Sequence, residues 1–200
     1  MIYGDYMPAL IDEIKAAYKQ GKFSQLPRGP IGSYVEVPRR QYRDIAESII
    51  RGFLNAFIVN NTRDRQILNG ILAKYTNSPP MVITFGDFRN EVYQDVSKGC
   101  VHPPPDTVLL MNEIKCSDPV VMNCLIDRIH IETVLLTNRK DIAENITSIQ
   151  QNVPRNLSKV IAITDGNIRL EYYPMPNYRM YSTKIKQANF IQVNIEERIR

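Results

Sequence analysis

Few side chains of this 200-residue chain stand at spacings that support catalysis or metal binding. Cys100 and His102 are close in sequence, but two such near ligands strain to reach one tetrahedral ion, so a loop thiol is the favoured interpretation. His130 precedes an apolar segment and is expected to be a packed or surface histidine rather than a general base. Glu196 and Glu197 fit the solvated face of a helix. The sequence therefore predicts no metal site and no catalytic residue.

The sequence also contains no motif of a phosphate-binding loop. Such loops need clustered glycines, because only glycine lets the backbone N–H groups come close to the anion. Neither G-x-x-x-x-G-K-[ST] nor G-x-G-x-x-G occurs, and no serine lies in a G-x-S-x-G turn. The nearest candidate, Gly29-Pro30-Ile31-Gly32, has no lysine and precedes a predicted strand. No cofactor is expected.

Aromatic rings and positive charges alternate near the C-terminal end, between residues 172 and 186. Proteins that bind single-stranded nucleic acid need both, because bases stack on the rings and the cations neutralise phosphates. A proline-rich segment whose tyrosines pack on a sheet would explain the same pattern. On the first interpretation the DNA-binding residues are Tyr178, Arg179, Tyr181, Lys184 and Lys186.

A second basic run lies near the N-terminus and extends the predicted DNA-binding set. Lys15, Lys19 and Lys22 follow i, i+4, i+7 spacing, which places them on one face of a helix and its end. Arg28 follows in the next segment. If the two chain ends lie together, the two basic runs could form one patch. A third cluster, at residues 39–43, is better explained as a solvated helix face.

Composition bounds the class of protein without defining it. The net charge of +4 permits an anionic partner but does not require one. A hydrophobic content of 44% is ordinary for a folded chain. The three cysteines are odd in number and lack C-x-x-C spacing, which favours reduced thiols in an intracellular protein. No apolar run approaches a membrane span, and no signal peptide is recognised.

The elements that must position these residues include the same pattern twice. Residues 45–71 and 121–147 both read as helix, short strand, helix, at a shift of 76 residues (121 − 45). Identities between the copies are few, so a chance resemblance of two ordinary βα units remains the alternative to a true repeat. Strands and helices that alternate in this way predict an α/β fold.

The remaining elements follow from helical and strand periodicity and from turn residues. Capping residues are expected at Asn60 or Asn61, at Asp118 before Pro119, and at Asn138 with Asp141. Asp165-Gly166 predicts a two-residue hairpin turn. The predicted helices are 7–20, 41–54, one from the Asn60–Asn61 cap to about 74, those that follow Asp118 and Asn138, and one that begins near 191; the predicted strands are 31–37, 56–59, 81–85, 107–111, 132–136, 160–164 and 167–172.

Several segments resemble the hinge domain of structural maintenance of chromosomes (SMC) proteins. GPIGSYVEV followed by AFIVNNTRDRQIL is similar to the first hinge subdomain, and SDPVVMNCLIDRIHIETVLLTNRKDIAENI to the second. The Asp165-Gly166 turn matches the terminal hairpin. YGDYMPAL and FGDFRNEVYQD resemble the sixth-subunit subgroup of the family. The resemblance covers most of the chain.

The resemblance implies a fold of two pseudo-symmetric mixed α/β subdomains, flanked by the ends of coiled-coil arms. Residues 1–28 would enter from one arm, 29–105 would form subdomain I, 106–186 subdomain II, and 187–200 the start of the returning coiled coil. The ATPase heads lie elsewhere in such proteins, so the hinge itself would not be an enzyme. The implied dimer interface includes Phe85, Phe88, Arg89, Ile168, Leu170 and Tyr172.

The resemblance further implies partners and a location. The hinge would pair with that of the fifth SMC subunit and bind DNA, preferably single-stranded, and non-SMC subunits of the complex are possible further partners. The complex would act on chromosomes in the nucleus, in maintenance and recombinational repair. In one respect the chain departs from the family. YYPMPNYRMYST stands where many hinges have a glycine-rich run that lets two backbones approach, so a simple transfer of the symmetric interface is in doubt.

Three hypotheses follow. The first is a non-catalytic heterodimerisation hinge that also binds DNA. The second is a protein-only interaction scaffold, in which the basic runs serve solubility. The third and weakest is an α/β enzyme that binds a small ligand where strands end.

Overall fold

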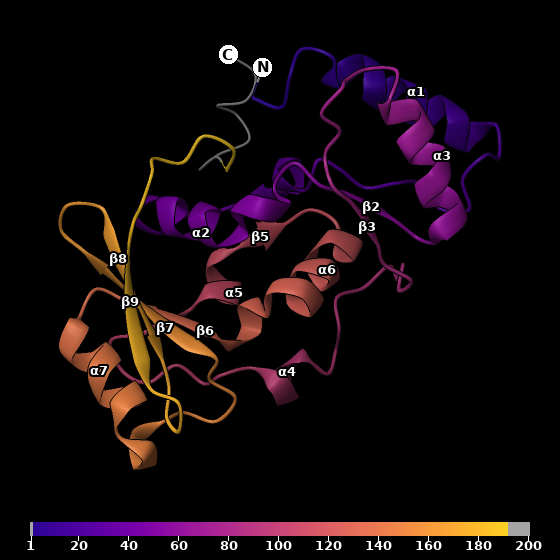
Figure 1. Cartoon of the computed structure of the whole chain (residues 1–200). Helices are drawn as coiled ribbons and strands as arrows, with labels where there is room; N and C mark the ends of the chain where they lie inside the picture. The colour runs from indigo at the N-terminus through magenta and orange to yellow at the C-terminus, as the bar shows by residue number, and fades with distance from the viewer. Residues whose placement is uncertain (1, 192–200) are drawn as a thin grey trace.

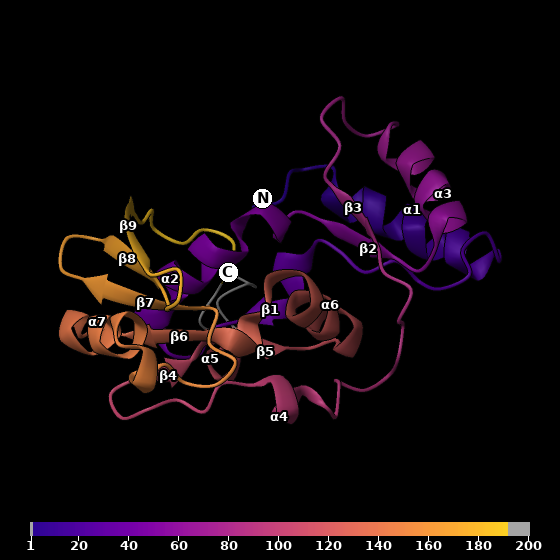
Figure 2. The same ribbon diagram turned by 60° about the horizontal axis from the view of Figure 1, so that its bottom comes forward.

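The computed structural model describes residues 2–191, and two groups of strands and helices form its opposite ends (Figure 1). One end contains α1, α3, β2 and β3, and the other contains α7 and the strands β7 to β9 (Figures 1 and 2). The elements are α1 (Met7–Lys19), β1 (Val35–Glu36), α2 (Arg43–Ile50), β2 (Phe57–Val59), α3 (Thr62–Leu72), β3 (Val82–Thr84), α4 (Val96–Gly99), β4 (Val108–Leu109), α5 (Leu110–Glu113), β5 (Lys115–Cys116), α6 (Pro119–Ile129), β6 (Val134–Thr137), α7 (Lys140–Ser148), β7 (Lys159–Thr164), β8 (Ile168–Tyr173) and β9 (Arg179–Lys184), with 3₁₀ turns at Ile31–Tyr34, Arg40–Tyr42, Arg51–Phe53, Ile131–Thr133 and Gln150–Asn152.

The predicted repeat is present in the fold. A shift of 76 residues moves α2 to 119–126, within α6, and moves β2 to 133–135, which overlaps β6. The same shift moves α3 onto α7 and β3 onto the start of β7. In both copies the two strands pair in parallel, β2 with β3 and β6 with β7. The two halves of the chain therefore share one order of elements and one strand pairing.

The second half adds strands that the first half lacks. Its five-stranded sheet has the order β4-β6-β7-β8-β9, in which only β6 and β7 are parallel. Side chains alternate between the two faces of β7, as the pleat requires. Val160 and Ala162 pack in the cluster that includes Ala143 and Ile146 of α7, whereas Ile161 belongs to the central core.

The central core joins the two halves. It contains Ile45 and Ile58 from the first half and Leu125 and Val134 from the second, all fully buried or nearly so. The short strands β1 and β5 pair antiparallel across the same junction, with Val35 opposite Cys116. Two ion pairs also cross it, Arg28 with Asp118 at 2.9 Å and Arg39 with Glu113.

The beginning and end of the described chain lie side by side. The Tyr3 hydroxyl donates a hydrogen bond to the Phe190 carbonyl at 3.3 Å, and the two rings are 5.5 Å apart. Two carboxylates of α2 hold the final segment. Glu47 accepts hydrogen bonds from the backbone N–H groups of residues 189–191, and Asp44 accepts one from that of Ala188.

Two elements of the first half differ from those predicted. Residues 31–37 were predicted as one strand, but the Ser33 amide and hydroxyl both donate to the Pro30 carbonyl and form a 3₁₀ turn, so only Val35–Glu36 is strand. The helix expected over 41–54 is α2 with a 3₁₀ turn at each end. Most other bounds differ by one to three residues.

Three expectations were wrong in the second half, and one strand was missed. The strand predicted at 107–111 is two residues long and runs directly into α5. Asn138 does not cap α7; Arg139 occupies that position, bonded to Thr137 and paired with Asp141. The hairpin loop has three residues, 165–167, because Thr164 pairs with Ile168. The strand β9 was not expected. The helix predicted from 191 lies outside the described residues.

Within residues 2–191, no helix combines the length and the apolar character needed to cross a membrane.

Candidate nucleic-acid and partner interfaces

One face of the β8–β9 hairpin carries a cluster of rings and cations. Register and alternation place Tyr173, Arg179 and Tyr181 on the same face. The Arg179 guanidinium lies 4.3 Å from the centre of the Tyr173 ring and 6.0 Å from that of Tyr181, and the two rings meet edge to face at 5.9 Å. We call Lys159, Arg169, Tyr173, Arg179 and Tyr181 the tyrosine–arginine cluster.

A buried carboxylate neutralises part of this cluster. Glu171 accepts hydrogen bonds from Lys159 at 2.7 Å and from the Tyr173 hydroxyl at 2.8 Å, and Arg169 lies 3.4 Å away. Burial by itself raises the pKa of Glu171, but these hydrogen bonds and the charges of Lys159 and Arg169 outweigh it and hold the pKa below its ordinary value. Arg179 has no carboxylate partner among residues 2–191 and is the uncompensated cation of the cluster.

The structure divides the predicted C-terminal DNA-binding residues among three places. Arg179 and Tyr181 belong to the tyrosine–arginine cluster. Tyr178 lies near Glu144 of α7; burial, followed by that carboxylate, raises its pKa. Lys184 and Lys186 line a pocket beside α2. The order of these residues in the sequence therefore does not correspond to one row of neighbouring side chains on the structure.

The N-terminal basic run lies elsewhere on the molecule. Lys15, Lys19 and Lys22 are exposed on or just after α1, which packs beside α3 at the end of the molecule away from β9 (Figure 1). The two basic runs do not merge, although the chain ends are adjacent, because α1 leads away from them. Arg28 is not a free cation, since its side chain pairs with Asp118 and lies over the Phe88 ring at 5.2 Å.

Several described strands are paired along one edge only, among them β3, β4 and β9. Among the described strands, β3 pairs only with β2, and β9 pairs only with β8. Phe85 donates to the carbonyl of Val59 across the β2–β3 pair, so in β3 the amides of Val82 and Thr84 face the open edge. An edge of this kind offers N–H and C=O groups to a second chain, although the Thr84 carbonyl already accepts a hydrogen bond from Arg128 of α6 at 3.2 Å.

The predicted interface residues differ in their exposure. Phe85 and Tyr172 are 6% and 5% exposed and belong to the cores of this chain. Leu170 is half-buried beside the α7 cluster, and Phe88 lies under Arg28. Ile168, at 39% exposed, is open to contact. Arg89 is also on the surface, paired with Asp87 at 2.8 Å and 5.0 Å from the Tyr93 ring centre.

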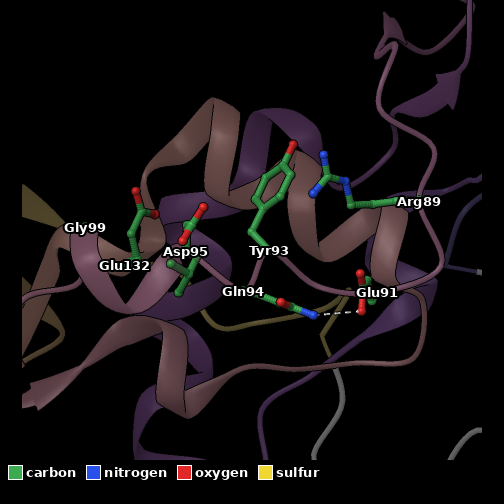
Figure 3. A pocket seen from close by; sticks show the side chains of 8 residues that line it. Arg89, Glu91, Tyr93, Gln94, Asp95, Gly99 and Glu132 are labelled. Carbon is green, nitrogen blue, oxygen red and sulfur yellow. Dashed lines mark hydrogen bonds between the residues drawn. The ribbon is translucent and has the colours of Figure 1, made fainter.

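The segment after β3 forms one side of a pocket of about 400 Å³ (Figure 3). Arg89, Tyr93 and Glu132 line it, with Gln94 bonded to Glu91 at its rim. Buried Asn123 of α6 holds the segment in place, because it accepts from the Tyr93 amide and donates to the Glu91 carbonyl. Sequence reasoning missed Asn123, although a lone amide on an apolar helix face was the available signal.

Among residues 2–191, the side chains first considered for catalysis do not come together in one reactive site; Glu196 and Glu197 lie outside the described residues. Burial raises the pKa of the Cys116 thiol to about 11 and that of Cys124 to about 12. Cys100 and His102 share a small cavity with Arg155. His130 is exposed, in the left-handed conformation that ends α6. Within the described residues, no group of three or more His, Cys, Asp or Glu side chains could hold a metal ion.

The known proteins that match this chain point to one family. Structural maintenance of chromosomes protein 6 of Takifugu rubripes is 32% identical over 99% of this chain, and that of Homo sapiens is 29% identical over 98%. The chain spans about one sixth (17%) of the length of these relatives. No protein-family model matches the chain.

A solved structure gives the same result for the fold. The crystal structure of the S. pombe Smc5/6 hinge domain superposes with a TM-score of 0.78 at 22% identity. The match covers 96% of this chain and 69% of that one. At this level of identity the likeness concerns the fold, and it extends over nearly all the described elements.

Proposed function

The chain is a hinge domain of the structural maintenance of chromosomes family, of the protein 6 type, and on that basis we propose that it is a non-catalytic domain that pairs with a second SMC hinge and binds DNA. The proposed partner is the hinge of the fifth SMC subunit. The proposed setting is a nuclear complex for chromosome maintenance and recombinational repair, with coiled-coil arms on both sides of the hinge and non-SMC subunits as further partners. The division at residues 105–106 into two subdomains is part of this proposal.

The observation that carries the pairing is the presence of an open strand edge in each half of the chain, at β3 in the first half and at β9, as well as β4, in the second. Two edges on related halves suit a partner that is built the same way, because each edge can receive a strand from the opposite half of the other hinge. The edges at β3 and β9 each have an exposed methionine beside them, Met81 at 53% and Met180 at 46%. Removal of such surface from water favours association.

The edges can be tested without disturbing the interior. Thr84→Pro removes an amide that faces the open edge of β3, so the bonds between β2 and β3 stay intact. We expect this variant to fold but to lose or weaken its association with the fifth subunit's hinge, measured by size-exclusion chromatography with light scattering. Thr84→Ala keeps the amide and serves as the control. No association of the wild-type hinges would refute the pairing proposal, and equal association of Thr84→Pro would exclude the β3 edge.

Support for DNA binding comes from the tyrosine–arginine cluster and from the cations beside α2. Arg179 and Tyr181 are exposed, and a flat ring beside a cation can stack on an unpaired base. This geometry favours single-stranded over double-stranded DNA, because bases in a duplex have no free face. Double-stranded binding and a protein-only role are the two other outcomes that a binding test can return.

We expect the wild-type chain to bind oligothymidylate with an affinity that falls linearly with salt on a logarithmic scale. Tyr181→Ala should weaken binding by about 1–3 kcal/mol, the typical contribution of one stacked base. Tyr18→Ala, which removes an exposed ring from α1, is the matched control. Fluorescence anisotropy across a salt series measures both effects. Absence of binding by the wild type at low salt would favour the protein-only scaffold.

A further inference from the structure

We propose that a pocket between α2 and the end of β9 binds a single phosphate group, an inference that rests on the proposed DNA binding and assigns one backbone phosphate to a particular place. The pocket has a volume of about 190 Å³. Both hydroxyls and cations line it, from α2 and the 3₁₀ turn that follows it, from β8, and from β9 and the segment after it. We call it the α2–β9 pocket; its polar lining includes Ser48, Arg51, Arg169, Thr183, Lys184 and Lys186.

The charge in the α2–β9 pocket suits an anion. Four cationic side chains line it together with one carboxylate, Glu47. That carboxylate is buried and accepts hydrogen bonds from the backbone amides of residues 189–191, so its oxygens already have donors. Arg51, Lys184 and Lys186 have no ion-pair partner in the described part of the chain. Positive charge therefore exceeds negative charge at this point, and it lies partly out of water.

Arg169 is held ready to donate to a ligand. Its side chain is only 15% exposed, and its guanidinium is fixed by a hydrogen bond to the Ser48 hydroxyl at 2.5 Å and by Glu171 at 3.4 Å. The Nε atom of Arg169 is buried and has no hydrogen-bond partner in the described structure. Buried donors are normally paired, so this one leaves the hydrogen bonding of Arg169 incomplete; because it is closed to solvent, the exposed cations of the pocket must make the first contact with a ligand. A phosphate oxygen is the acceptor that arginine binds best.

The size of the pocket limits the ligand. Pockets for whole small molecules have volumes of about 300–1,000 Å³, whereas one water occupies about 30 Å³. A volume near 190 Å³ therefore holds a phosphate group and some water but not a nucleotide. The base and sugar of a nucleic acid would have to lie outside the pocket.

The surroundings provide a place for such a base. Arg169 contacts Glu171, Glu171 is bonded to Tyr173, and Tyr173 stacks with Arg179. The α2–β9 pocket thus continues along β8 into the tyrosine–arginine cluster. A single strand with one phosphate in the pocket could place a neighbouring base on these rings. This arrangement identifies the ligand as a phosphodiester of single-stranded nucleic acid, with free phosphate as a weaker ligand of the same chemistry.

The test uses two exposed cations of the pocket, so that folding is not affected. The double variant Arg51→Gln, Lys186→Gln is compared with Arg63→Gln, Arg65→Gln, which removes the same charge from the exposed side of α3. Affinity for oligothymidylate is measured over a salt series. We expect the pocket variant to bind about tenfold more weakly, with a salt slope lower by about one for each lost contact. The control variant should match the wild type.

A second measurement separates this inference from the proposed DNA binding. Inorganic phosphate should raise the unfolding temperature of the wild type and of the control more than that of the pocket variant. If the wild type binds DNA but both double variants bind it equally, the pocket is wrong and the proposed function stands. If the wild type binds no DNA but phosphate stabilises it through these residues, the pocket stands and the DNA proposal fails. If neither ligand distinguishes the variants, the phosphate site is refuted.

Discussion

At the scale of single residues, Glu171 has the most consequential surroundings. Its carboxylate lies between Lys159, Arg169 and the Tyr173 hydroxyl, and so connects the tyrosine–arginine cluster to the α2–β9 pocket. A carboxylate in this position reduces the net charge but orients the cations that remain. The strand pattern of β8 gave no indication of this role, because alternation predicts which face a side chain occupies and not its partners.

The lowered pKa of Glu171 predicts a pH-dependent contribution to stability. A carboxyl whose pKa is lower in the folded state stabilises the fold at pH values above its unfolded pKa, and this contribution is lost as the pH falls through the folded value. Glu171→Gln should therefore be less stable than the wild type at neutral pH, and the difference should shrink below about pH 4.5, the ordinary pKa of the group. Urea unfolding at a series of pH values measures it. A difference that stays constant down to acid pH would contradict the assignment.

At the scale of elements, two helix starts with similar sequences behave differently. Asn61 caps α3, with its side-chain oxygen accepting from the Asp64 amide at 2.8 Å. Asn138 precedes a similar helix but makes no cap, because the Thr137 hydroxyl accepts from the Arg139 amide instead. The residue types alone predicted both caps, and only the neighbouring side chains decide between them.

This difference leads to a paired prediction. Asn61→Ala should lower the free energy of unfolding by about 1 kcal/mol, the usual cost of a lost cap. Asn138→Ala should change it by less than about 0.5 kcal/mol, as is typical of surface substitutions. Chemical denaturation of the two variants beside the wild type gives both values. Equal losses would mean that Asn138 also caps a helix in solution.

Much of the element order was predictable from the sequence, and the exceptions have physical causes. Apolar periodicity located α1, α2, α6 and the buried strands β2, β6 and β7, because those elements bury one face or both. In contrast, β9 is exposed at every position, so no apolar alternation marks it. Its pairing depends on β8, a tertiary contact that local sequence does not encode.

The candidate sites were less predictable than the fold for a related reason. Residue types indicated that cations and rings occur together near the C-terminal end. In the structure, Arg179 does lie beside Tyr181. Arg51, Arg169 and Ser48 come from segments about 120 residues apart, and only folding brings them together. Arg28, predicted to bind DNA, pairs with Asp118 because the two halves of the chain pack against each other.

At the scale of the whole molecule, the carboxylate of Glu47 ties the returning chain to α2. The amides of residues 189–191 all donate to it. Glu47→Gln replaces a charged acceptor by a neutral one with a single carbonyl oxygen, which leaves buried donors unsatisfied at a cost of about 1–3 kcal/mol. We expect hydrogen exchange at these three amides to become at least about tenfold faster, measured by mass spectrometry.

The matched control for this prediction is Glu144→Gln, an exposed position on α7 with the same change of charge. Its exchange at residues 189–191 should equal that of the wild type. Protection that is unchanged in Glu47→Gln would show that the packing of Ile185 and Ile191 in the core holds the segment by itself.

The closeness of Tyr3 and Phe190 has a mechanical consequence. Tension applied between these two residues acts on the hydrogen bond and ring contact that join them, and then on the amides held by Asp44 and Glu47. The five-stranded sheet and the junction between the halves lie outside this line of force. Under tension, the segments around Tyr3 and Phe190 would therefore detach first, at low force, while the interior of the domain stays folded.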